Sequence, residues 1–163
     1  GFAETAAVRP LMILPSGPAR REVSVFTAFS LDPDNHNVLV LYIAVGGALG
    51  AVARYALGGW IHSWAGAGFP WGTFAVNAIG SLLIGFSVHY LDATGAAPEL
   101  RAFVAAGILG TFTTFKFTYE AIVLLQQGAW ARAAAYTLGS LLVGLLSAGG
   151  GLLLGARVWP SAG

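Results

Sequence analysis

The chain has 163 residues, of which 56% are hydrophobic and only 9% are charged, and its formal net charge is +1. Soluble domains carry about 25% charged residues, so this composition excludes an ordinary soluble domain and indicates an integral membrane protein. The net charge gives no sign of a nucleic-acid partner. The absence of cysteine excludes disulfides, thiolate metal sites and cysteine nucleophiles.

The length allows four membrane crossings with short loops, because a bilayer core requires roughly 20 apolar residues per helix. Residues 1–37 differ from the rest, with seven charged side chains among scattered prolines. We predict a disordered or vector-derived N-terminal tail over 1–37, a membrane domain over 38–157 and a C-terminal tail over 158–163. Since four thin helices make a poor channel or enzyme alone, we expect an oligomer.

The first predicted helix runs from about Val38 to Trp60 and contains Gly46 and Gly50 at a four-residue spacing. Small residues at this spacing let two helix backbones approach closely in lipid. Arg54 comes late in this helix and has two interpretations. It is either an arginine that snorkels to the membrane interface or a fixed positive charge that draws anions into a vestibule.

The second predicted helix begins with Pro70 in its first turn and continues to about Tyr90. It carries Asn77, an amide that is costly in mid-bilayer unless it is satisfied. Asn77 therefore either bonds a neighbouring helix or faces a polar cavity.

The third predicted helix, from about Glu99 to Gln127, is interrupted between Gly107 and Glu120 by glycine, threonines and Lys116. Threonine hydroxyls compete for backbone hydrogen bonds, and glycine weakens a helix. In lipid such a weakened helix is tolerated only where it is buried in protein or lines a polar cavity. The sequence thus predicts a broken membrane helix beside a polar path.

The fourth predicted helix spans about Ala129 to Arg157 and places Tyr136 and Ser140 four residues apart on one face. These two polar side chains either join helices or line the path beside the interrupted segment. Its glycines at four-residue spacing favour close helix packing.

The arginines near the membrane ends do not specify an orientation. Arg101 and Arg157 fall on one predicted side, and Arg54 and Arg132 on the other. Because the excess of Lys and Arg in short loops sets orientation, this balance permits insertion both ways round.

No enzyme site emerges from the sequence. Glu120 is the one acid at depth in the predicted membrane part, and the histidines are too scattered to form a metal site with a carboxylate. What remains is a stripe of hydroxyls, one amide and phenyl rings, whose edges carry partial positive charge, and such a lining suits a small anion. Its members are Asn77, Ser81, Phe112, Thr113, Thr114, Phe115, Phe117, Thr118, Tyr136 and Ser140.

Four motifs in order across the membrane part resemble the Fluc (CrcB) fluoride channels. They are Gly46–Tyr55; Pro70–Thr73 with Val76–Ser81; Gly107–Gly110 with Thr113–Phe115 and Tyr119–Glu120; and Tyr136 with Ser140, Leu141, Gly144 and Leu145. The resemblance implies an all-α membrane protein of four helices per subunit, with the third helix broken, in an antiparallel dual-topology homodimer.

The resemblance also implies a function and its residues. The function is passive, selective permeation of fluoride through two pores in the cell inner membrane, which lowers cytoplasmic fluoride. A central structural Na⁺ would be held by backbone carbonyls at Gly110 and Thr113. The expected pore or fluoride-binding residues are Asn77, Phe112, Phe115, Phe117, Thr114, Thr118, Tyr136, Ser140 and Arg54.

The chain departs from the family at the third-helix motif, which is one residue short and places Lys116 where a small hydroxyl is usual. Residues three apart share a helix face but residues two apart do not. Phe115 and Phe117 can then line one pore only if the backbone between them is extended; otherwise Phe112 and Phe115 form the pair. We expect Lys116 either to reach Glu120 or a vestibule, or to point to the dimer centre in place of a cation.

Two other functions are compatible with the composition. One is a small four-helix drug/proton antiporter that uses Glu120 as its proton carrier, although the related proteins place that acid in the first helix. The other is a structural membrane subunit that carries no flux.

Overall fold

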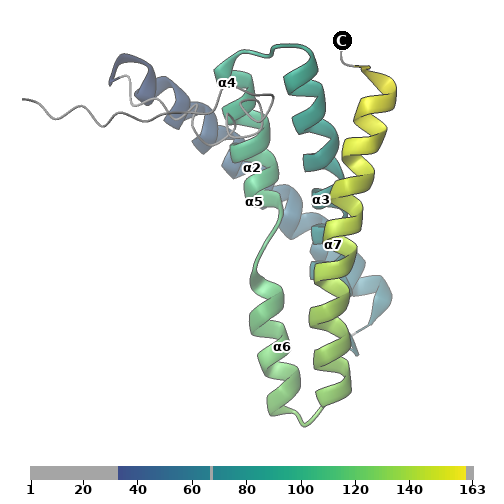
Figure 1. Ribbon diagram of the computed structural model, residues 1–163. Helices are drawn as coiled ribbons and strands as arrows, with labels where there is room; N and C mark the ends of the chain where they lie inside the picture. Colours follow the sequence, from purple (N-terminus) through teal and green to yellow (C-terminus); the bar gives the residue numbers. More distant parts are fainter. Residues whose placement is uncertain (1–32, 67, 161–163) are drawn as a thin grey trace, which may run out of the picture. The chain divides into compact units, whose positions relative to one another are not determined.

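The computed structural model describes residues 33–66 and 68–160, and its described part consists of helices and turns (Figure 1). Most of the predicted N-terminal tail and the end of the predicted C-terminal tail lie outside the described residues. The helices in chain order are α2 (Pro33–Ala65), α3 (Trp71–Ala93), α4 (Pro98–Arg101), η2 (Ala102–Leu109), α5 (Gly110–Phe112), α6 (Lys116–Gln126) and α7 (Trp130–Val158).

Four segments are long and apolar enough to cross a membrane: Asn37–Ala65, Trp71–Ala93, Pro98–Gln126 and Trp130–Val158. The expected number of crossings is confirmed, and the chain is a multi-pass membrane protein. Two details of the prediction were wrong. Helix α2 begins at Pro33 rather than at Val38, and Pro70 occupies the N-cap position of α3 instead of its first turn.

Glycines set how closely the helices pack. The most extensive contact is between α3 and α7, where Gly85 lies against the backbone of Ala148, and Gly151 against that of Leu82. A Cβ at either glycine would collide with a carbonyl oxygen of the facing helix. Without a hydrophobic driving force between helices in lipid, such close backbone contact supplies the van der Waals attraction that holds them together.

Helix α2 packs in the same way against η2, a segment wound as a π-helix that the sequence did not predict. A Cβ at Gly46 would lie 2.5 Å from the carbonyl oxygen of Phe103. The hydroxyl of Thr111 lies 3.0 Å from the Gly47 carbonyl and 2.8 Å from the Gly107 carbonyl, which ties α5 to α2. π-Helical turns are frequent next to functional sites, and only the short helix α5 separates this one from the helix break.

Arg101 stabilises the turn between α3 and α4. Its guanidinium forms an ion pair with Asp92 and donates to the carbonyl oxygens of Leu91 at 2.6 Å and Ala96 at 3.0 Å. The bond to Leu91 serves a carbonyl at the C-terminal end of α3, and the bond to Ala96 holds the loop that follows the helix.

The third crossing is broken at Thr113–Phe115, as the sequence predicted. Thr113 has extended backbone angles (φ −76°, ψ 158°), and helix resumes at Lys116. Figure 1 shows this segment as an extended link between α5 and α6, beside α7. The break therefore places backbone polar groups in the middle of a membrane span, where each of them requires a partner.

Candidate functional site

The side-chain amide of Asn77 on α3 bonds to the backbone of the helix break. Its Oδ1 accepts from the Thr114 backbone N–H at 2.8 Å, and its Nδ2 donates to the Thr114 carbonyl at 2.9 Å. An amide side chain can supply one donor and one acceptor side by side, so it satisfies both backbone groups of one residue. Of the two interpretations of Asn77, contact with a neighbouring helix is what the structure shows.

This pairing changes the hydrogen bonding of Gly110. In a continuous helix the Thr114 N–H would bond to the Gly110 carbonyl, four residues earlier. Here that N–H bonds to Asn77 instead. The Gly110 carbonyl consequently loses its helical donor, and it becomes available to another partner.

Gly80 provides the space in which the broken segment lies against α3. A Cβ at this position would come within 2.5 Å of Thr113 Cγ2 and 3.0 Å of Phe112 Cδ1. Phe112 is accordingly buried (7% exposed) beneath the break. The hydroxyl of Thr113 donates back to the Leu109 carbonyl at 3.2 Å.

The phenyl rings of Phe115 and Phe117 lie together, with centroids 5.4 Å apart and planes inclined at 43°. Phe115 is 79% exposed and Phe117 only 8%. The extended residue, Thr113, precedes Phe115 and does not lie between the two rings. Which pair of rings lines a pore stays a prediction. Phe115 sits just outside α6, and its ring can turn toward Phe117 from that N-cap position.

Two hydroxyls bond to the backbone at the start of α6. The Lys116 N–H donates to Thr114 Oγ1 at 3.1 Å, and Thr118 Oγ1 donates to the Phe115 carbonyl at 2.8 Å. Both contacts satisfy backbone groups beside the break. Thr114 and Thr118 are thus engaged in shaping the segment that carries the phenyl rings.

A carboxylate joins three helices beside the break. Glu120 accepts from Thr73 Oγ1 at 3.0 Å and from the hydroxyl of Tyr136 at 2.6 Å, and its Oε1 lies 3.0 Å from the ammonium of Lys116. Tyr136 is fully buried, with the rings of Phe69 and Phe117 edge-on to it. The expected contact of Lys116 with Glu120 is confirmed.

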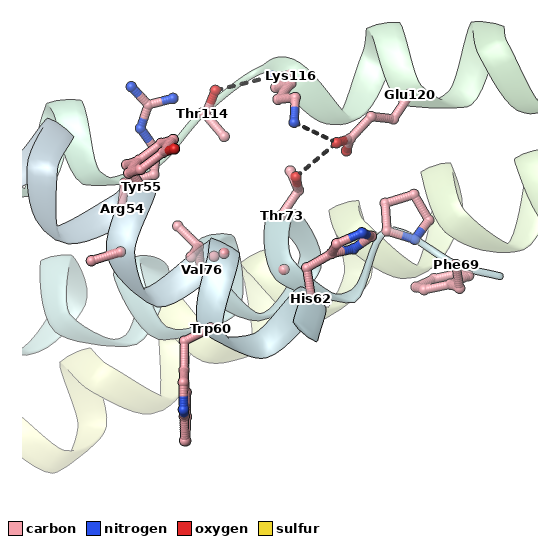
Figure 2. A pocket seen from close by; sticks show the side chains of 15 residues that line it. Arg54, Tyr55, Trp60, His62, Phe69, Thr73, Val76, Thr114, Lys116 and Glu120 are labelled. Carbon is pink, nitrogen blue, oxygen red and sulfur yellow. Dashed lines mark hydrogen bonds and ion pairs between the residues drawn. The ribbon is translucent and has the colours of Figure 1, made fainter. Parts of the chain in front are cut away.

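A cavity of about 750 Å³ opens beside this carboxylate. Figure 2 shows the Lys116 ammonium and Thr73 directed toward Glu120, and Arg54 and His62 of α2 also line the cavity. The charged or polar side chains that line it are Arg54, Tyr55, His62, Thr73, Thr114, Lys116 and Glu120. Arg54 Nε and Ser140 Oγ are buried and have no hydrogen-bond partner within residues 33–66 and 68–160.

The structure therefore brings together most of the predicted site residues, in two adjacent groups. One group surrounds the break, and the other surrounds Glu120. Ser140 and Arg54 bond to neither of them. Thr73 was missed as a site residue, although its position four residues before Asn77 on one face of α3 was a usable signal.

Comparison with known proteins identifies the family. The model of the family described as "CrcB-like protein, Camphor Resistance (CrcB)" matches residues 41–152, which include every residue of both groups. The chain belongs to the CrcB family.

Curated relatives of this CrcB chain are named "Fluoride-specific ion channel FluC". One from Thermus thermophilus is 48% identical over 119 residues, which cover 72% of this chain and 94% of the relative. Relatives from Rhizobium meliloti and Agrobacterium fabrum are 44% and 43% identical; they cover 71% and 74% of this chain, and 94% and 98% of their own lengths. The resemblance drawn from the sequence is confirmed.

Proposed function

We propose that this chain is a fluoride-selective ion channel, which lowers cytoplasmic fluoride by passive permeation and is not an enzyme. The observation that carries the proposal is the CrcB match over residues 41–152, together with relatives named as fluoride-specific channels. The drug/proton antiporter gains no support from these relatives. Glu120 is instead bound by the Thr73 and Tyr136 hydroxyls and by Lys116.

The chemistry of the site supports a small anion. Hydroxyl hydrogens and phenyl ring edges carry partial positive charge, and such groups lie around the break and in the wall of the adjoining cavity. Selective conduction requires binding that is favourable enough to admit an ion and weak enough to release it. The Ser140 hydroxyl has no hydrogen-bond partner in the part of the chain that the structure describes. Neutral donors such as this hydroxyl, with the Phe115 and Phe117 ring edges, meet the requirement better than a fixed charge within the pore.

We further propose that two copies assemble as an antiparallel homodimer with two pores, in the cell inner membrane. In a single subunit Phe115 is 79% exposed. The Lys116 side chain beside it is 60% exposed. A lysine that faces hydrocarbon is costly, and a second copy or a water-filled space removes that cost. The near balance of arginines at the membrane ends supports insertion both ways round.

A central Na⁺ between the two copies is also part of the proposal. The residues fit it, because the break diverts the Thr114 N–H from the Gly110 carbonyl and leaves a hard oxygen ligand. Thr113, at the extended point of the break, offers a second carbonyl. Bound Na⁺ would hold the two breaks together. The protein should then unfold at a higher temperature in a sodium salt than in the salt of a large organic cation. Equal unfolding temperatures in the two salts would contradict the proposed Na⁺ site.

The test of the function is ion efflux from liposomes that contain the purified protein. With potassium made permeable by an ionophore, a fluoride electrode should record rapid fluoride efflux, and a chloride electrode should record almost none. Protein-free liposomes give the baseline. Equal rates for the two anions, or fluoride efflux no faster than from protein-free liposomes, would refute the proposal.

A further inference from the structure

Lys116 is the only lysine in the chain, and local helix stability does not account for it. It is the first residue of α6, the end at which the helix dipole is positive. A cation at that end is unfavourable. Its lysine-first spacing to Glu120 is also the weaker order for a helical ion pair.

Lys116 is not needed to satisfy Glu120 either. The two carboxylate oxygens already accept from Thr73 at 3.0 Å and from Tyr136 at 2.6 Å. An ammonium group has three N–H donors, and Lys116 directs one of them to Glu120 Oε1 at 3.0 Å. The Lys116 side chain is 60% exposed and lines the open cavity, and no second side-chain partner among residues 33–66 and 68–160 engages its other donors.

The fixed charges of the cavity wall favour an anion only because Lys116 is present. Arg54 and Lys116 contribute two positive charges and Glu120 one negative charge, which leaves a net formal charge of +1 with His62 neutral. Without Lys116, Arg54 and Glu120 would cancel. A cleft with walls of one net sign concentrates the opposite ion and raises its rate of entry.

We propose that Lys116 is the residue that concentrates small anions in this cavity, and that Glu120 keeps it from trapping them. The inference rests on the proposed channel function. Two unopposed cations would bind an anion tightly, whereas conduction requires release. The carboxylate 3.0 Å from the ammonium competes with the anion for it. The Lys116–Glu120 pair thus attracts the anion into the cavity without binding it tightly.

Single-channel currents in planar bilayers test this inference, because unitary conductance does not depend on how much of a variant folds. Fluoride is kept at one low concentration, and a salt of an impermeant organic anion sets the ionic strength at about 0.1 M or about 1 M. The Debye length is about 10 Å at the lower value and about 3 Å at the higher. The charge of Lys116 acts on the cavity in the first case and is screened in the second.

At about 0.1 M, Lys116→Gln should lower the fluoride conductance about two- to three-fold, as expected for one unit charge some 6–7 Å from an ion in water. At about 1 M the loss should shrink below about 1.5-fold. Lys116→Arg should behave as the parent chain does. The double variant Lys116→Gln/Glu120→Gln, which restores the net charge of +1, should recover conductance relative to Lys116→Gln.

Arg132→Gln is the matched control, since it removes one exposed positive charge that does not line the cavity. It should leave the conductance unchanged at both ionic strengths. An equal loss in Lys116→Gln at both ionic strengths, no loss at all, or the same loss in Arg132→Gln would overturn the inference. If the parent chain carries no fluoride-selective current, the proposed function itself fails, which is a separate result.

Discussion

At the scale of single residues, Asn77 has the contacts that most constrain the site. One side-chain amide replaces two backbone hydrogen bonds at Thr114, at 2.8 and 2.9 Å. It thereby stabilises an extended residue inside a membrane span and leaves the Gly110 carbonyl without its helical donor. Asn77, which the sequence predicts as a pore residue, therefore also stabilises the backbone conformation of the helix break.

Asn77→Asp should disrupt the break while hardly changing the size of the side chain. Aspartate retains an acceptor for the Thr114 N–H, but it places a second oxygen against the Thr114 carbonyl in place of a donor. An unsatisfied buried group costs about 1–3 kcal/mol, so we expect a lower unfolding temperature and strongly reduced fluoride efflux.

The control for this variant is Asn37→Asp, the same chemical change at an exposed position near the start of α2. It should leave efflux and unfolding temperature close to those of the parent chain. Parental efflux and stability in Asn77→Asp would show that the amide does not hold the break.

At the scale of helices, the arrangement depends on glycines that face a neighbouring backbone. Gly85 and Gly151 bring α3 and α7 into contact, and Gly46 and Gly107 bring α2 and η2 together. This packing fixes the rotation of α3, so that Thr73 and Asn77 face α6 and the break. The site is therefore a consequence of helix packing as well as of its own side chains.

Gly151→Ala should destabilise the protein, because the new Cβ would collide with the Leu82 carbonyl and lie 2.8 Å from the Phe86 nitrogen. Overpacking of this kind costs about 1–3 kcal/mol. Gly150→Ala is the matched control on the same helix, since its Cβ would meet only Leu82 Cδ1 at 3.9 Å. Thermal unfolding in detergent should place Gly151→Ala clearly below the parent chain and Gly150→Ala at or above it; the reverse order would contradict this packing.

At the scale of the whole molecule, the proposed dimer requires that one chain insert in two orientations. Arg101 and Arg157 lie in α4 and at the end of α7, on the same side of the helix assembly, and Arg132 begins the other end of α7 (Figure 1). Small changes in the number of arginines on either side of the membrane should then alter the orientation of the chain, because Lys and Arg in short loops dominate that orientation.

Reporter fusions to the C-terminus of the full chain should give both inside and outside signals. Arg132→Gln and Arg157→Gln each remove one positive charge from opposite sides, and they should shift the ratio of the two signals in opposite directions. One clean orientation in the parent chain, or a shift in the same direction in both variants, would argue against dual topology.

The sequence by itself determined the features that depend on short stretches of chain. Hydropathy over about 20 residues gave the four crossings. Threonines and a glycine gave the broken third helix, and the four-residue spacing of Lys116 and Glu120 allowed the ion pair that was one of the two expected positions of Lys116. The order of the motifs gave the family. Apart from the family, each of these properties is set by neighbours along one helix.

Only the tertiary structure decided which side chains meet across helices. Asn77 bonds to Thr114 across 37 positions of sequence, and Thr73 to Glu120 across 47. The pairing of Phe115 with Phe117, and the burial of Phe112 against Gly80, also depended on how the break lies against α3. Such contacts depend on the rotation and register of packed helices, which glycine contacts between backbones determine and which no local pattern in the sequence contains.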